Sequence, residues 1–163
     1  MKTISLILGS VVFLSLLALA ESSSQIEGAI KNIFPTFQEY KVESLFLDNQ
    51  EVKVCTVIRE AKILGWTVIL DEMGKIKPIT FLVAIDIEGN ILAVNVLEYR
   101  DMFGSEIKRR SFLRQFQGKS LKDSIVVGRD IDAVTGASIS SHAAASAVKK
   151  SLTIIERIQK DLP

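Results

Sequence analysis

The fold of this chain is decided by the stretch ITFLVAIDIEGNILAVNV, residues 79–96. Two runs rich in β-branched residues flank the turn sequence Glu88-Gly89-Asn90, a pattern typical of a β-hairpin. A link this short cannot hold a crossover helix, so the two strands must pair antiparallel. The stretch therefore predicts an antiparallel sheet.

Three further runs of the same character precede this hairpin. They end at turn residues such as Asp48-Asn49, Glu60-Ala61 and Met73-Gly74, and again the links are too short for helices. Together with the hairpin they predict a sheet of about five consecutive antiparallel strands. The predicted strands are 42–47, 52–58, 63–70, 79–87 and 91–97.

Helical spacing of apolar residues occurs on both sides of the strand region. A short helix is predicted after the serines 22–24 and ends at Phe34-Pro35, and a second helical stretch is predicted over 107–116. The longest prediction is a helix over 141–162, with apolar residues at spacings of three and four. The predicted fold class is α+β: a curved antiparallel sheet of about five strands with an N-terminal helix and a long C-terminal helix.

The first 20 residues have the pattern of an export signal. Lys2 precedes the uncharged run 4–20, which ends in Ala18-Leu19-Ala20, with small residues at the minus-three and minus-one positions. The run is shorter than the roughly 20 residues of a spanning helix. We therefore expect a signal peptide over 1–20, with a short retained anchor as the alternative, and a single domain over 21–163. Both alternatives place the domain outside the cytoplasm.

Charge and composition exclude several function classes. The chain has 20 Lys and Arg against 19 Asp and Glu, and after the leader the two signs balance. This balance argues against a general binder of nucleic acid or of an anionic membrane, because both need a concentrated positive field. One cysteine and one histidine permit no internal disulfide and cannot form a zinc site with each other alone.

The segment 130–141, DIDAVTGASISS, is unlike an ordinary connection. It contains carboxylates, hydroxyls and Gly136, and it leads directly into the predicted C-terminal helix. The unpaired amides and the macrodipole at a helix N-terminus favour a phosphate there. From the residues alone, two interpretations stay open: an anion-binding loop, or a serine-rich helix cap.

Seven residues of this segment, Asp132-Ala133-Val134-Thr135-Gly136-Ala137-Ser138, resemble the Asp-x-x-(Ser/Thr)-Gly-Ala-(Thr/Ser) flavinylation motif of the FMN-binding domain family. That family includes the FMN-carrying small subunits of Rnf-type and sodium-pumping NADH:quinone oxidoreductase complexes. The resemblance extends over about residues 60–155, because the segments GWTV (65–68), GSEI (104–107) and FLRQFQGK (112–119) follow in the family's order.

The resemblance implies that FMN is joined by a phosphodiester bond to the hydroxyl of Ser138. In the family a separate flavin transferase attaches it, using FAD and magnesium. Most members have threonine where this chain has Ser138, which keeps the hydroxyl. The stretch 97–104 lacks the His-x-Glu-Thr-Pro-Gly segment of the respiratory-complex branch, so the resemblance points to a stand-alone relative.

Two segments supply the predicted cofactor-binding residues. Tyr99 and Phe103 lie where the family has its flavin-proximal loop, and the guanidinium of Arg100 can bind a phosphate or the pyrimidine edge of a flavin. Trp66 and Phe116 are expected in the core. The predicted site residues are Ser138, Asp132, Thr135, Gly136, Ala137, Ser140, Tyr99, Arg100 and Gly104.

The sequence thus predicts an exported flavoprotein that carries one FMN and transfers electrons between redox partners at the membrane or outside the cytoplasm. A flavin transferase is the expected maturation partner. One alternative is a domain that binds FMN or another phosphorylated ligand noncovalently. The other is an exported flavin-dependent reductase or a serine hydrolase, the latter with Ser138 and His142 as nucleophile and base. The cluster 108–110 (Lys-Arg-Arg) is either a solvated helix face or a docking patch for an acidic redox partner.

Overall fold

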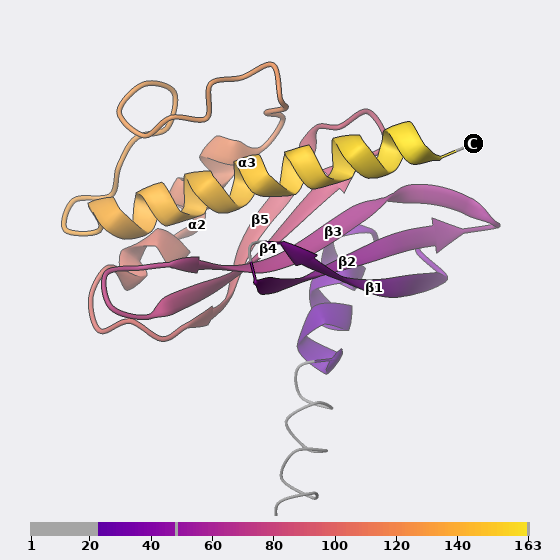
Figure 1. The fold of residues 1–163 in the computed structure, drawn as a ribbon, viewed down its shortest axis with the longest axis horizontal. Coiled ribbons are helices and arrows are strands. Elements are labelled where there is room, and N and C mark those ends of the chain that lie inside the picture. Colours follow the sequence, from indigo (N-terminus) through magenta and orange to yellow (C-terminus); the bar gives the residue numbers. More distant parts are fainter. Residues whose placement is uncertain (1–22, 48, 163) are drawn as a thin grey trace, which may run out of the picture. The chain divides into compact units, whose positions relative to one another are not determined.

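A computed structural model describes residues 23–47 and 49–162 (Figure 1). The chain divides into two compact units, Met1–Pro35 and Thr36–Pro163. The described part of the first unit forms a helix over 23–33, which confirms the predicted N-terminal helix. The predicted leader lies outside the described residues. Within the described ranges, no helix has both the length and the apolar character needed to cross a membrane.

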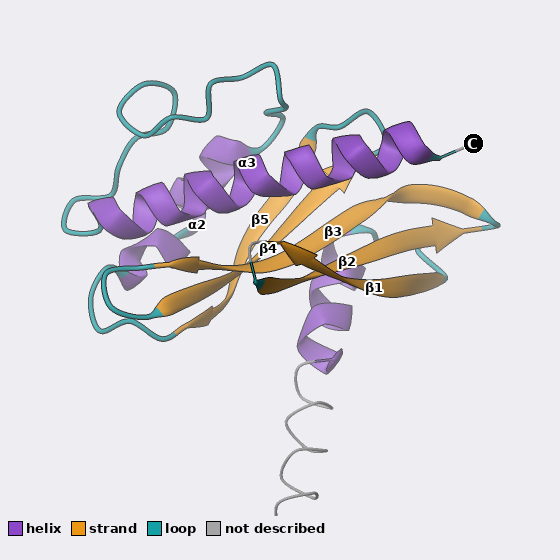
Figure 2. Ribbon diagram, viewed as in Figure 1, coloured by secondary structure: helices purple, strands orange, loops and turns teal. Residues whose placement is uncertain are grey.

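The second unit is built on a five-stranded antiparallel sheet in the order β1-β2-β3-β4-β5 (Figure 2). Strands that follow each other in the chain pair with each other, as their short links require. Three β-bulges shift the register and add curvature, one between β2 and β3 and two between β4 and β5. The predicted curved sheet is confirmed. The strands are β1 Glu39–Leu47, β2 Gln50–Arg59, β3 Lys62–Met73, β4 Pro78–Asp86 and β5 Ile91–Tyr99.

The long helix α3, Ser138–Asp161, crosses one face of this sheet (Figure 1). Alternate residues of β4, namely Phe81, Val83 and Ile85, point toward α3 and form one buried cluster with it. The predicted C-terminal helix is confirmed, but it begins at Ser138, three residues before the predicted start. Leu162 lies past its last residue and is 44% exposed.

The segment after β5 differs from the single helix predicted over 107–116. It forms three short turns: η1 Ser105–Lys108, α2 Arg110–Leu113 and η2 Arg114–Phe116. Arg109 has an extended backbone (φ −61°, ψ 133°) that separates η1 from α2. This break allows Ile107, Phe112 and Phe116 all to be buried, although their spacing of five and then four does not follow one helical stripe.

Candidate functional site

Ser138 is the first residue of α3, and it is exposed. The preceding residue, Ala137, is buried, and its side chain makes no capping hydrogen bond to the amides of the first turn. Because α3 has 24 residues, its uncapped amides carry the positive end of a long macrodipole. An exposed hydroxyl therefore lies beside a helix terminus that is suited to a phosphate.

An open cavity of about 260 Å³ lies around this hydroxyl. Residues 136–140 form one wall, while Lys75 comes from the turn between β3 and β4 and Phe103 from the loop after β5. The Lys75 Nζ lies 6.0 Å from the centre of the Phe103 ring, within the range of a cation–π contact. The cavity thus brings together a hydroxyl, a cation and an aromatic ring from three separate segments.

Gly136, the glycine of the motif, leaves one side of the loop backbone uncovered near Ser138. Gly136 has φ +80°, in the left-handed region, and a Cβ atom built there would meet nothing within 4 Å. Glycine is therefore suited to this position by its backbone conformation, while the open side of the backbone can be approached by a ligand. Thr135 and Asp132 are exposed on the same loop. The backbone of Asp132 is held by Gln115, which accepts from its N–H (2.8 Å) and donates to its carbonyl (3.2 Å).

Ser141 holds this loop in place, and Asp130 holds the turn that precedes it. The Ser141 hydroxyl donates to the Ala137 carbonyl (2.9 Å) and accepts from the Val134 N–H (3.2 Å). The Asp130 carboxylate accepts from the amides of Val126 (2.7 Å) and Ile125 (2.9 Å). These amides, with the ammonium of Lys119, lower the pKa of Asp130 to about 2. The only sequence signal for Asp130 is that aspartates often cap the amides of turns.

Tyr99, Gly104 and Ser140, all predicted site residues, lie together behind the cavity. The Tyr99 hydroxyl donates to the Phe103 carbonyl (2.5 Å) and lies 3.0 Å from the Ser140 Oγ. Ser140 is 2% exposed. Gly104 has φ +95°, and a Cβ there would lie 2.6 Å from the Ser140 Oγ and 2.8 Å from the Tyr99 hydroxyl. These three residues hold the Phe103 loop against the first turn of α3.

Arg100 lies apart from this group. It donates to the Thr80 hydroxyl (2.9 Å) and to the Pro78 carbonyl (3.3 Å), and it forms ion pairs with Glu98 and, at 3.7 Å, with Asp71. Its guanidinium is therefore occupied by residues of β3, β4 and β5, and it does not line the cavity around Ser138.

Lys75 and Asp101 belong to the site but were missed from the sequence. The Asp101 carboxylate accepts from the amides of Ile76 (2.9 Å) and Met102 (3.0 Å), and these hydrogen bonds lower its pKa. It thereby ties the turn that carries Lys75 to the loop that carries Phe103. The sequence identified the turn at Met73-Gly74, but it could not indicate which loop the tip of that turn would meet.

His142, the base of the hydrolase alternative, is exposed one helical turn after Ser138. It makes no hydrogen bond or ion pair with any residue that the structure describes, so no carboxylate orients its ring. A Ser-His pair without an orienting acid lacks a part of the hydrolase triad. Among the described residues, no group of three or more His, Cys, Asp and Glu side chains could hold a metal ion.

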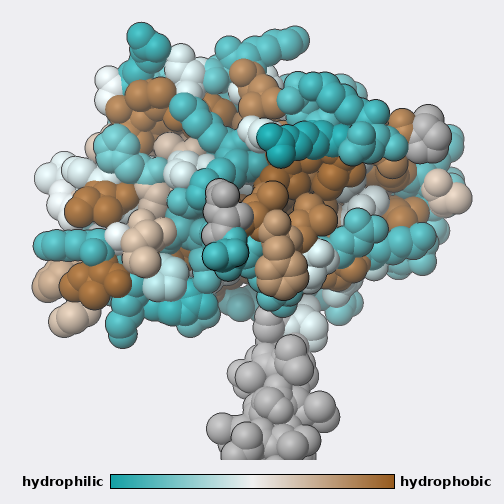
Figure 3. Space-filling view, in the orientation of Figure 1, coloured by the Kyte–Doolittle hydropathy of each residue, from teal (hydrophilic) through white to brown (hydrophobic). Residues whose placement is uncertain are grey.

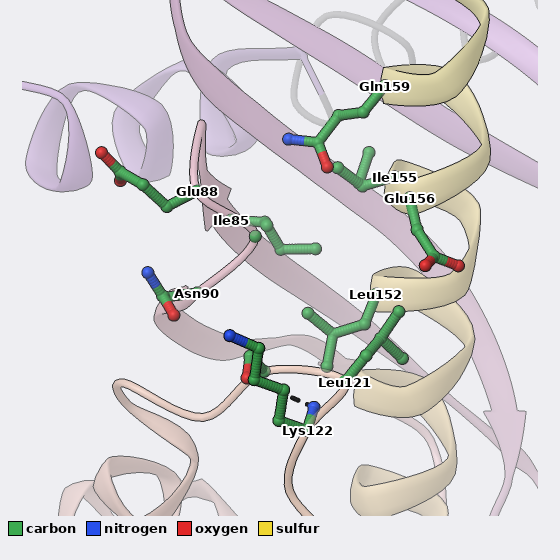
Figure 4. A pocket seen from close by; sticks show the side chains of 11 residues that line it. Ile85, Glu88, Asn90, Leu121, Lys122, Leu152, Ile155, Glu156 and Gln159 are labelled. Atoms are coloured by element: carbon green, nitrogen blue, oxygen red, sulfur yellow. Dashed lines mark hydrogen bonds between the residues drawn. The ribbon is translucent and has the colours of Figure 1, made fainter.

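A second cavity lies near the C-terminal end of α3 (Figure 4). Its volume is about 170 Å³, smaller than the 260 Å³ of the cavity at Ser138. Figure 4 shows Glu88 and Asn90 of the β4–β5 turn across from Glu156 and Gln159 of α3. None of the predicted site residues lines it. The cavity at Ser138 is therefore the better candidate.

Comparisons with known proteins identify the domain that contains this cavity. Residues 74–153 match the FMN-binding domain family, a range that lies within the predicted 60–155 and contains both the Lys75 turn and Ser138. The crystal structure of NqrC from Shewanella oneidensis aligns with a TM-score of 0.51 at 18% identity, covering 74% of this chain and 67% of that one, and so shares the fold. No curated protein matches the sequence. Residues 74–153 therefore form a domain of the FMN-binding family, and the cofactor is FMN.

Proposed function

We propose that this protein carries FMN covalently, through a phosphoester to the Ser138 Oγ, and transfers electrons between redox partners at the membrane or outside the cytoplasm. The observation that carries the proposal is the exposed Ser138 hydroxyl, which lies at the uncapped N-terminus of α3 and lines an open cavity with Lys75 and Phe103. The family's motif places its modified hydroxyl at the same position.

The residues around the cavity fit the two chemical halves of FMN. The amides of the first turn and the ammonium of Lys75 are donors for a phosphate. Phe103 and Ile139 are 63% and 50% exposed, and they offer apolar surface to a flat conjugated ring. FMN supplies the reversible redox chemistry, whereas the protein binds it and leaves it accessible to a partner.

Attachment requires only that a flavin transferase reaches the hydroxyl. The Ser138 Oγ forms a bond to the FMN phosphorus of FAD while the pyrophosphate bond breaks. AMP then leaves, and the hydroxyl proton passes to a base of the transferase or to solvent. Asp132, Thr135 and Gly136 are exposed on the loop beside Ser138, where such an enzyme could recognise them.

The proposed location rests on the predicted leader. Lys2 and the apolar run that ends in Ala18-Leu19-Ala20 favour export, with the mature chain beginning at Glu21. Sequencing the N-terminus of the protein recovered from the periplasm tests this directly. Recovery of an unprocessed chain from the cytoplasm would contradict it.

The attachment site can be tested by intact mass and in-gel fluorescence after denaturation, in a host that makes the transferase. We expect Ser138→Ala to lose covalent flavin entirely and Ser138→Thr to retain it, because only a hydroxyl can form the ester. Ser111→Ala is the matched control, since Ser111 is an exposed serine of α2 that lies outside this loop and does not line the cavity. Covalent flavin on the Ser138→Ala variant would move the site to another hydroxyl. Release of all flavin from the wild-type chain on denaturation would support the noncovalent alternative.

A further inference from the structure

A groove of about 390 Å³ lies between the C-terminal half of α3 and the β1–β2 hairpin. In Figure 3, hydrophobic surface gathers directly below a hydrophilic row on α3. The floor of the groove is apolar, and the cations of its rim come from α3. The lining residues used below are Leu47, Val52 and Leu70 of the strands and Lys149, Ile154 and Arg157 of the helix.

The groove exists because α3 does not cover the whole sheet. The helix packs on β3 and β4, which leaves the end of the β1–β2 hairpin projecting beyond it. Leu47, at the end of β1, faces the same side as α3 and remains 37% exposed. An apolar surface that stays open beside a helix is typical of a place where another chain segment packs.

The charges of the groove have one sign. Lys149 and Arg157 lie eight residues apart on α3, about 12 Å along its axis, and both are exposed. Lys150 is neutralised by Glu72, with its Nζ 2.5 Å from a carboxylate oxygen. Neither Lys149 nor Arg157 forms an ion pair with a described residue, and no carboxylate is among the described residues that line the groove. The rim is therefore complementary to a row of acidic groups.

The volume indicates how much of a partner could enter. At about 30 Å³ for each water-sized atom, the groove holds about 13 heavy atoms, which is about three leucine side chains. The apolar side chains of one amphipathic helix, spaced at i, i+3 or i+4, and i+7, match this amount. A bilayer surface fits less well, because it cannot follow a concave floor, and only two unpaired cations face outward.

We propose that this groove binds an acidic amphipathic helix of a partner protein. The helix inserts apolar side chains between α3 and the β1–β2 hairpin and sets carboxylates against Lys149 and Arg157. The groove is separate from the flavin site, since Ser138 and Arg157 are 19 residues apart on α3, about 28 Å along the axis. Docking there leaves the Ser138 cavity open.

The test uses the full-length chain and a fluorescein-labelled 18-residue helical peptide with leucine at i, i+3 or i+4, and i+7 and glutamate elsewhere. Fluorescence anisotropy in low salt gives its Kd. We expect the Lys149→Glu/Arg157→Glu variant to bind this peptide at least tenfold more weakly and to prefer the same peptide with lysines in place of glutamates. The matched control is Lys108→Glu/Arg110→Glu, which makes the same charge change on an exposed cluster outside the groove and should alter Kd by less than about twofold.

A second variant tests the apolar floor. Leu47→Asp places a carboxylate on a partly exposed position, so we expect an unchanged melting temperature and at least fivefold weaker binding of the acidic peptide. The proposal would be overturned if the Lys149→Glu/Arg157→Glu and Lys108→Glu/Arg110→Glu variants lost equal affinity for the acidic peptide. It would also be overturned if Leu47→Asp lost none. Two other results for the Lys149→Glu/Arg157→Glu variant would also overturn it, if peptide binding stayed unchanged. One is the loss of binding to vesicles of anionic phospholipid, and the other is the loss of a dimer of this chain.

Discussion

The first turn of α3 and the turns that follow it belong to one helix but differ in what they contact. Beyond the first turn, Ala144, Val148 and Leu152 are buried against the sheet. In the first turn Ser138 and Ile139 are exposed, and the turn is held by polar contacts of Tyr99 and Ser141. Packing against the sheet therefore secures the helix, while Ser138 at its start remains exposed.

The largest expected effect comes from the packed region. Phe81 is fully buried under α3, so Phe81→Ala should lower the free energy of unfolding by about 3–5 kcal/mol. Ser138→Ala should change it by less than about 0.5 kcal/mol, because Ser138 is exposed and packs against little. Urea unfolding followed by circular dichroism measures both. Similar losses in the two variants would mean that the first turn carries as much stability as the core.

Two left-handed glycines near Ser138 differ in how closely they are packed. Gly104→Ala combines a left-handed residue with contacts of 2.6 and 2.8 Å, and we expect a loss of about 2–4 kcal/mol. Gly136→Ala also places an alanine in the left-handed region, but its Cβ meets free space. Its free energy of unfolding should therefore fall by only about 1–2 kcal/mol. Thermal unfolding of the two variants measures the difference. Equal losses of stability would mean that a Cβ atom at Gly104 is no more crowded than one at Gly136, contrary to the structure.

Removing the Tyr99 hydroxyl should have a smaller effect. Tyr99→Phe loses the hydrogen bonds to the Phe103 carbonyl and to Ser140, about 1–2 kcal/mol in total. FMN loading should fall without being abolished, because the Phe103 loop loosens while Ser138 is unchanged. A double-mutant cycle with Ser140→Ala tests the contact between the two hydroxyls. Because the two residues share a hydrogen bond, the stability losses of the two single variants should not add up in the double variant. Additive losses would indicate that the two hydroxyls act independently.

The smallest effect is expected at Asp130, and it should disappear in acid. Its pKa is lowered to about 2 in the folded chain, chiefly by the Val126 amide, while an unfolded aspartate titrates near about 3.9. The carboxylate therefore stabilises the fold above about pH 4, and this contribution is lost as the pH falls toward 2. Asp130→Asn should have a lower melting temperature than the wild type at pH 7, and the difference should shrink at pH 2. A difference that is the same at both pH values would remove Asp130 as the cause.

Most of the sheet could be predicted from local sequence. The period-two runs and the turn residues placed all five strands within three residues of their observed ends, since both signals act between near neighbours. The helix expected over 107–116 was not one helix. The apolar residues of this segment match the spacing of one helix only in part. The break at Arg109 arises because Ile107, Phe112 and Phe116 must all reach the core, which the local sequence does not locate.

The residues of the candidate site also fall into those that a local motif predicts and those that come from distant segments. The motif indicated Ser138 and Gly136 as candidates, because the residue types of a short loop carry that information. It gave no role to Lys75, which lines the cavity from about 60 residues earlier in the chain, or to Asp101, which holds the turn that carries Lys75. The Ser140 hydroxyl was predicted as a ligand, but its partner Tyr99 lies 41 residues away and leaves it buried. Arg100, also predicted there, is held by partners on the sheet.

Local sequence was enough to predict the antiparallel sheet, the long C-terminal helix and the Ser138 hydroxyl as the candidate attachment group at the start of that helix, because each prediction depends on residues that are close together in the chain. Only the tertiary structure decided which side chains surround that hydroxyl and that the groove below Lys149 and Arg157 stays open. Both depend on how the hairpins curve and where α3 crosses them. Such contacts between distant segments arise from the packing of the whole core, which no local pattern encodes.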